Sequence, residues 1–98
     1  MIVHYLQDGG LELRDASEFK KFKVVLEGCA AKRPEIQGVR FVDDGNALVR
    51  IDAVPALRGA PGDASWRTGF DAMIKDAAKY GWIDEAAGAI KAHVEREG

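Results

Sequence analysis

The sequence contains a single cysteine, Cys29, and this scarcity bounds the class of protein. One cysteine excludes an internal disulfide, whereas small secreted domains usually depend on several. The amino-terminal residues carry neither a basic segment nor a long apolar run, so they lack the pattern of a signal peptide. We therefore expect the chain in a reducing compartment and predict a cytoplasmic location.

The chain also lacks long apolar runs and an excess of either charge. No stretch approaches the roughly 18 consecutive apolar residues of a membrane span. The 14 basic and 16 acidic residues give a net charge of −2, whereas nucleic-acid binders usually carry a basic excess. A small soluble protein that binds neither a membrane nor nucleic acid is the expectation.

Motifs that would identify a reaction or a cofactor are missing as well. The sequence holds no glycine-rich phosphate loop and no Gly-x-Ser-x-Gly nucleophile elbow. Two histidines and one cysteine do not supply the four ligands that a zinc site typically needs. We predict no catalytic residue, no cofactor and no metal site. Whether the protein is an enzyme stays open, with the balance against it.

The residues that are present suffice for one core. Leucine, isoleucine, valine and phenylalanine make up 24 of the 98 residues, above the roughly 20% below which disorder is expected. A chain of this size buries roughly 60–65% of its unfolded surface. We therefore predict a single domain over residues 1–98.

Two β-hairpins are indicated by turn chemistry. Residues 1–6 and 11–14 are rich in apolar residues, and residues 39–42 and 47–54 form a second pair of predicted strands. The intervening turns are Gln7-Asp8-Gly9-Gly10 and Asp43-Asp44-Gly45-Asn46. Glycine after an acidic residue adopts the positive φ that tight hairpin turns need.

Helical periodicity follows each hairpin. An apolar stripe of Phe19, Phe22, Leu26 and Cys29 predicts a helix over about 15–33. Similar spacing predicts helices from Asp63 or Ser65 to about residue 80, and from Asp84 toward the end of the chain. The order is ββαββαα, which predicts an α+β two-layer sandwich. Its antiparallel sheet of about four strands should carry the helices on one face.

Charged residues of the sheet are the first candidate for function. Arg14, Arg40 and Arg50 fall at polar positions of the predicted strands, so they should project from the face opposite the helices. Arginine is suited to bidentate recognition of carboxylates and phosphates. Glu12 and Asp52 share this face, however, and simple cross-strand pairing is the alternative. A basic cluster on the first predicted helix is interpreted as a solvated face: Lys20, Lys21, Lys23, Lys32 and Arg33.

A stiff loop and a group of aromatic residues are the second candidate. Leu57 and Arg58 lie in residues 55–63, which hold two prolines and two glycines, and ordered surface loops often carry function. Trp66, Tyr80 and Trp82 are three large aromatic residues close together in sequence. Core packing would explain them, but interface hot spots use the same residue types.

Three hypotheses of function follow from these surfaces. The leading one is a non-enzymatic binding or protein-interaction module that binds a protein partner or a second copy of itself. The second is a small enzyme, or an enzyme subunit, with a site near His4, Arg50 and Arg58. The third is a small-molecule-sensing domain whose ligand lies in the cleft between sheet and helices.

Overall fold

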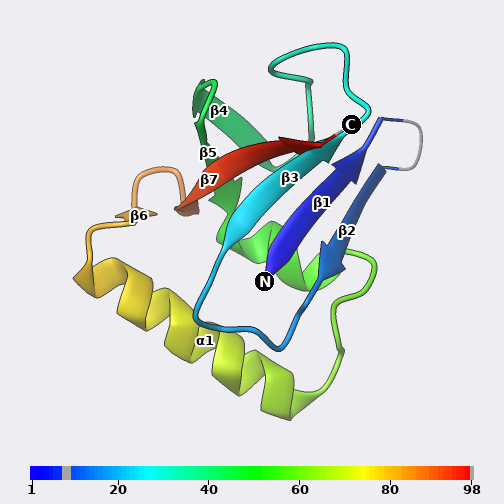
Figure 1. Ribbon diagram of the computed structural model, residues 1–98. Helices are drawn as coiled ribbons and strands as arrows, with labels where there is room; N and C mark the ends of the chain where they lie inside the picture. Colours follow the sequence, from blue (N-terminus) through cyan, green and yellow to red (C-terminus); the bar gives the residue numbers. More distant parts are fainter. Residues whose placement is uncertain (8–9, 98) are drawn as a thin grey trace.

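A mixed β-sheet forms the body of the protein in the computed structural model, which describes residues 1–7 and 10–97 (Figure 1). The strands are β1 (Ile2–Leu6), β2 (Gly10–Arg14), β3 (Lys23–Glu27), β4 (Val39–Asp43), β5 (Asn46–Arg50), β6 (Ile83–Asp84) and β7 (Ala89–Glu97). The helical elements are a 3₁₀ helix, η1 (Ile51–Ala56), and one main helix, α1 (Ala64–Lys79). The α+β class is thus confirmed.

The sheet has the order β2-β1-β3-β7-β5-β4, with β6 beside β7. β1, β3 and β7 run parallel to one another, whereas β2, β5 and β4 pair antiparallel to their neighbours. The predicted antiparallel sheet of four strands is therefore wrong. So is the predicted order ββαββαα, because two of its three helices are replaced by strands.

The first of these replaced helices was expected over residues 15–33, where the structure has β3. Val24, Val25 and Leu26 are all buried, because β3 lies between two parallel neighbours in the middle of the sheet. Strands of this kind are buried on both faces and have continuous apolar runs. Cys29 consequently follows a strand instead of lying on a helical stripe, and partial burial raises the pKa of its thiol.

The second replaced helix was expected after Asp84, where β6 and β7 form a hairpin. Ile90, Ala92 and Val94 point into the core, and the residues between them are exposed. This strict alternation is the signature of a half-buried strand. Gly88 has a φ of 62° in the connecting turn, a conformation that glycine adopts without a steric cost.

Both predicted hairpins exist as antiparallel pairs. The turn residues Asp8 and Gly9 of the first hairpin lie outside the described residues. In the second, the Asp43 carboxylate accepts hydrogen bonds from the Gly45 amide at 2.8 Å and from Asn46 Nδ2 at 3.1 Å. The strand predicted over 47–54 ends at Arg50, where η1 begins.

Helix α1 agrees with its prediction at both ends. The Asp63 carboxylate accepts a hydrogen bond from the Trp66 amide at 2.7 Å and caps the first turn. At the other end Gly81 has a φ of 76°, and the Trp82 amide donates to the Ala77 carbonyl at 3.0 Å. This Schellman arrangement satisfies carbonyls that the helix end would leave unpaired.

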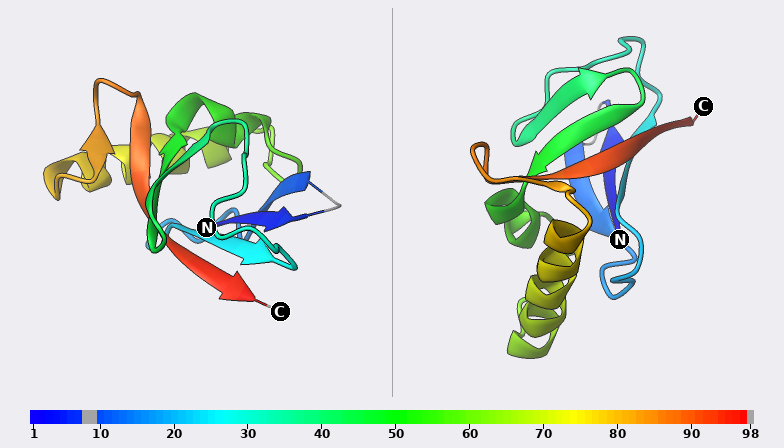
Figure 2. Two further views of the ribbon diagram at one scale, coloured as in Figure 1. Left: turned by 90° about the horizontal axis from the view of Figure 1, so that it is seen from above. Right: turned by 90° about the vertical axis from the view of Figure 1, so that its left-hand side faces the viewer.

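The core lies where α1 crosses one end of the curved sheet (Figure 2). The buried residues of α1 are Trp66, Phe70, Met73 and Ala77. The Trp66 and Phe70 rings stack with centroids 5.2 Å apart, and Trp66 Nε1 donates to the Ala16 carbonyl at 2.7 Å. The indole is therefore a core side chain with its one polar atom satisfied.

Candidate interaction surface

A break in strand pairing along one edge of β7 creates the most distinctive surface feature. β5 occupies one edge of β7, pairing with residues 89–93. On the opposite edge, β6 pairs with Ile90 and Ala89, and β3 pairs from His93 onward. The chain segments that lead into β3 and β6 must therefore approach each other beside Lys91 and Ala92.

These two segments and α1 enclose a groove of about 350 Å³. In Figure 1 the segment before β3 passes in front of α1 on its way to the sheet. We call this groove the aromatic groove; its lining residues are Phe19, Lys20, Lys21, Phe22, Met73, Asp76, Ala77, Tyr80, Trp82 and Ile90. A second hollow of about 210 Å³ adjoins it, shares Phe22, Trp82 and Ile90, and adds Asn46 and Lys91.

Phe19 fixes one wall of the aromatic groove against α1. A Cβ atom on Gly69 of α1 would lie 2.6 Å from two atoms of the Phe19 ring, so only glycine permits this close approach. Phe19 and Phe22 are both half-buried and pack against the core. The segment 19–22 is thus anchored by its aromatic residues, whereas Lys20 and Lys21 are exposed.

The opposite wall carries two exposed aromatic side chains. Tyr80 is 71% exposed and Trp82 is 52% exposed, with ring centroids 5.3 Å apart and planes tilted by 32°. The positive φ of Gly81 turns the chain between them as α1 ends. Exposed apolar groups that line a concavity are typical of binding sites, and nothing in the fold of this domain requires these rings to lie outside the core.

The charges around the aromatic groove are unevenly matched. The Asp76 carboxylate lies 3.7 Å from Lys79 Nζ, three residues further along α1. Within the part of the chain that the structure describes, no salt bridge engages Lys20, Lys21 or Lys91. The aromatic walls are therefore accompanied by ammonium groups that form no salt bridge with the described acidic residues.

The candidate arginines of the sheet share a face but do not form one patch. Three strands separate Arg14 on β2 from Arg50 on β5. Arg14 Nε donates to Glu12 at 2.7 Å, and Arg50 donates to both carboxylate oxygens of Asp52 at 3.1 and 2.9 Å. The hydrogen bond from each guanidinium holds the pKa of its partner carboxyl below the usual range. Intramolecular pairing accounts for both arginines.

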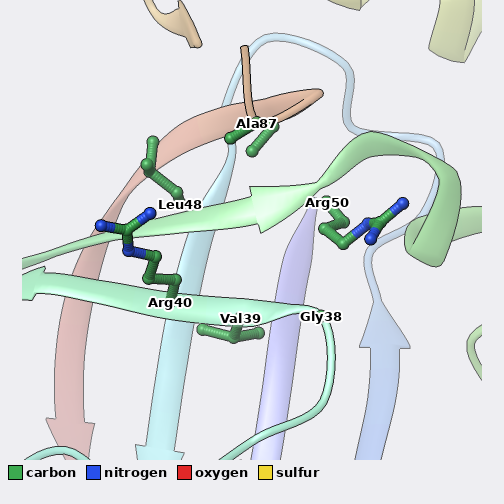
Figure 3. A pocket seen from close by; sticks show the side chains of 7 residues that line it. Gly38, Val39, Arg40, Leu48, Arg50 and Ala87 are labelled. Carbon is green, nitrogen blue, oxygen red and sulfur yellow. The ribbon is translucent and has the colours of Figure 1, made fainter. Parts of the chain in front are cut away.

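Arg40 lies at a shallow hollow of about 210 Å³ on the outer side of β4 and β5. Figure 3 shows Arg40 and Arg50 on neighbouring strands with their guanidinium groups pointing away from each other. Leu48 and Val39 supply the apolar part of the lining. Two cations that point apart do not converge on a single anion, so this hollow is a weaker candidate than the aromatic groove.

The predicted functional loop closes one margin of the sheet. Leu57 is half-buried and packs against the core. The carbonyl of Arg58 accepts a hydrogen bond from the Leu13 amide at 2.7 Å, so this part of the loop pairs with β2. Gly59 has a φ of 91°, and a Cβ there would lie 2.3 Å from the Leu13 carbonyl oxygen. The loop thus has a structural role at the β2 edge.

His4 is a buried polar residue on the face of the sheet opposite the core. The residue is 2% exposed, and its Nε2 has no hydrogen-bond partner among residues 1–7 and 10–97. That atom lies 3.6 Å from Glu27, and Nδ1 lies 4.0 Å from Glu12. Glu12 pairs with Arg58 through the backbone. Arg50 is engaged with Asp52 and lies on β5, with β3 and β7 between it and β1. His4 lines none of the cavities described above.

Residues 1–7 and 10–97 contain no group of His, Cys, Asp and Glu that could hold a metal ion. No helix in these ranges is long and apolar enough to cross a membrane. The chain matches no protein-family model, and neither a curated protein nor a solved structure is significantly similar to it.

Of the three aromatic candidates, the structure therefore separates one from the other two. Trp66 belongs to the core, while Tyr80 and Trp82 form one wall of the aromatic groove. Sequence reasoning missed the other wall, because residues 19–22 were assigned to a helix that does not exist. The pair Lys20-Lys21 between two phenylalanines was the available signal, since anchored aromatics would leave the lysines facing outward.

Proposed function

We propose that the protein is a polypeptide-binding module whose binding site is the aromatic groove. The observation that carries this proposal is the exposed Tyr80–Trp82 pair on a concave surface. Tyrosine and tryptophan dominate the binding energy of protein interfaces because they bury large areas at a low cost in side-chain entropy. Here the two exposed rings lie at the carboxyl end of the capped helix α1.

The shape of the aromatic groove favours a polypeptide over a small ligand. Sites for small molecules usually enclose most of the ligand surface, whereas Tyr80 and Trp82 remain more than half exposed in this open groove. An extended segment could place one or two side chains between the walls and leave the rest of its chain along the rim. Recognition by side-chain anchors in a groove is common among peptide-binding domains.

Selection of peptides provides the direct test. A library of random dodecamers, displayed on phage, is panned against the folded protein. The enriched peptides are then synthesised with a fluorescent label and titrated with the protein while the anisotropy of the label is recorded. We expect Trp82→Ala to weaken binding by at least about 30-fold, the threshold for a hot spot. The matched control is Val42→Ala, which shortens another exposed apolar side chain, 55% exposed on β4.

One result of this titration would contradict the proposal. If the peptides bind the Trp82→Ala variant with the same affinity as the unchanged protein, the binding surface lies elsewhere. Light scattering over a range of protein concentrations then distinguishes a foreign segment from a second copy of this chain. Self-association that Trp82→Ala abolishes would identify the partner polypeptide as the protein itself.

A further inference from the structure

We infer that the segment bound in the aromatic groove is acidic, with carboxylates placed beside an aromatic or large aliphatic anchor. This inference rests on the function proposed above and adds the chemistry of the partner. It is carried by Lys20 and Lys21, which line the groove and have no salt-bridge partner among residues 1–7 and 10–97.

Lys20 and Lys21 are held at the rim by the residues on either side of them. Phe19 packs against Gly69 of α1, and Phe22 packs against the core. The backbone between these anchors is therefore fixed, and both lysines line the aromatic groove. Their ammonium groups need solvent or an external anion, because no salt bridge among the described residues engages them.

Two acidic groups lie near this rim, Glu18 and Asp76. Glu18 accepts a hydrogen bond from the Lys20 backbone amide at 3.0 Å, and Asp76 lies 3.7 Å from Lys79. On the far side of Trp82, Lys91 shares a hollow with Asp84 and Glu85. Glu18 keeps its negative charge when it accepts from a backbone amide, whereas Asp76 is paired with Lys79. Of these groups, Lys20 and Lys21 therefore leave the rim with a net positive charge.

The aromatic walls and the two lysines together set two requirements for the partner. The aromatic walls provide apolar area for one anchor side chain, and the two ammonium groups provide attraction for carboxylates that flank it. A basic segment would place like charges together, which weakens association. A neutral segment would use the walls but would leave the lysines solvated, so it would bind less tightly than its acidic counterpart.

The experiment extends the peptide selection. We expect the enriched dodecamers to contain an aromatic or large aliphatic residue with aspartate or glutamate nearby. The consensus peptide is then compared with a version in which glutamine replaces every glutamate and asparagine every aspartate. The neutral version should bind about ten-fold more weakly, within the range for two exposed ion pairs.

Charge variants of the protein provide the matched comparison. The double variant Lys20→Gln/Lys21→Gln should lose about ten-fold in affinity for the acidic peptide and little for the neutral one. Its control, Lys32→Gln/Lys75→Gln, removes the same charge from two exposed lysines that line no described cavity. Thermal unfolding of both variants shows that they are folded. Raising the salt concentration from about 50 to about 500 mM should weaken the binding of the acidic peptide only. The reason is that the distance over which charges attract each other shortens as the ionic strength rises.

The possible results separate this inference from the proposed function. Enrichment of neutral or basic peptides whose binding depends on Trp82 would overturn the acidic partner and leave the peptide-binding function standing. Equal losses in the two double variants would also overturn the specific role of Lys20 and Lys21. If no enriched peptide depends on Trp82, both the inference and the proposed function are wrong.

Discussion

The close contact between Gly69 and Phe19 yields a prediction whose sign depends on the partner residue. Replacing Gly69 with alanine in α1 adds helix propensity, which stabilises the folded state by about 1 kcal/mol. The new Cβ would lie 2.6 Å from the Phe19 ring, and overpacking of this kind costs about 1–3 kcal/mol. In the unchanged protein, Gly69→Ala should therefore lower the free energy of unfolding by about 0–2 kcal/mol.

Removing the ring should reverse this effect. In a Phe19→Ala background the new methyl group no longer meets the ring, so Gly69→Ala should raise the free energy of unfolding by about 1 kcal/mol. The coupling between the two positions is then about 1–3 kcal/mol, the value expected for residues in direct contact. Urea denaturation of the four proteins of this cycle measures each term.

A control and a refuting result complete the cycle. Ala72→Gly, at an exposed position of the same helix, should lower the free energy of unfolding by about 1 kcal/mol in both backgrounds, since it changes propensity alone. If Gly69→Ala stabilises both backgrounds equally, Phe19 does not pack on α1. The wall of the aromatic groove would then lack the anchor described here.

Further predictions concern a glycine turn, the two tryptophans and the surface carboxylates. Gly59→Ala should lower the free energy of unfolding by more than about 2 kcal/mol, because its φ is 91° and a Cβ would meet a backbone oxygen; a small change in urea denaturation would contradict this. Trp66→Ala should cost about 3–5 kcal/mol as a core truncation, whereas Trp82→Ala should cost less than about 1 kcal/mol; thermal unfolding ranks them, and the reverse ranking would refute the assignment. Hydrogen-bond donors lower the pKa of five carboxyls in the folded state, four of them exposed and one, Glu12, half-buried. Their contribution to stability is therefore present above the ordinary carboxyl pKa of about 4 and is lost as the pH falls through the lowered values. Urea denaturation between about pH 6 and pH 2 should show this loss, reduced at high salt, and a stability that rises on acidification would contradict it. The carboxyls and their principal donors are Glu12 with Arg14, Asp43 with the Gly45 amide, Asp44 with Arg33, Asp52 with Arg50, and Glu95 with Lys23.

Elements that depend on neighbouring residues could be predicted from the sequence. The Asp43–Asn46 turn and the capped ends of α1 are specified by contacts within a few residues, and both are present as predicted. Ile90 and Val94 show why the rest failed. A spacing of four fits one face of a helix and also one face of a strand, and the buried Ala92 between them was the residue that distinguished the two.

The same ambiguity affected the middle of the sheet. Phe22 and Leu26 are also four residues apart, and Val24 between them is buried. Pairing of β3 with β1 and β7 joins segments distant in sequence, so no local pattern specifies it. The aromatic groove was predicted least completely for this reason. Tyr80 and Trp82 could be named from the sequence as one wall, whereas segment 19–22 could not be named as the other.

The break in pairing along β7 has a consequence for how the proposed binding site is built. One wall of the aromatic groove comes from residues 19–22 and the other from 80–82, and these segments lead into strands that pair with the same edge of β7. Ile90 of β7 also lines the groove, so the groove is complete only when segments distant in sequence are joined in the folded sheet. A peptide bound there should therefore stabilise the full sheet and not merely the surface that it touches.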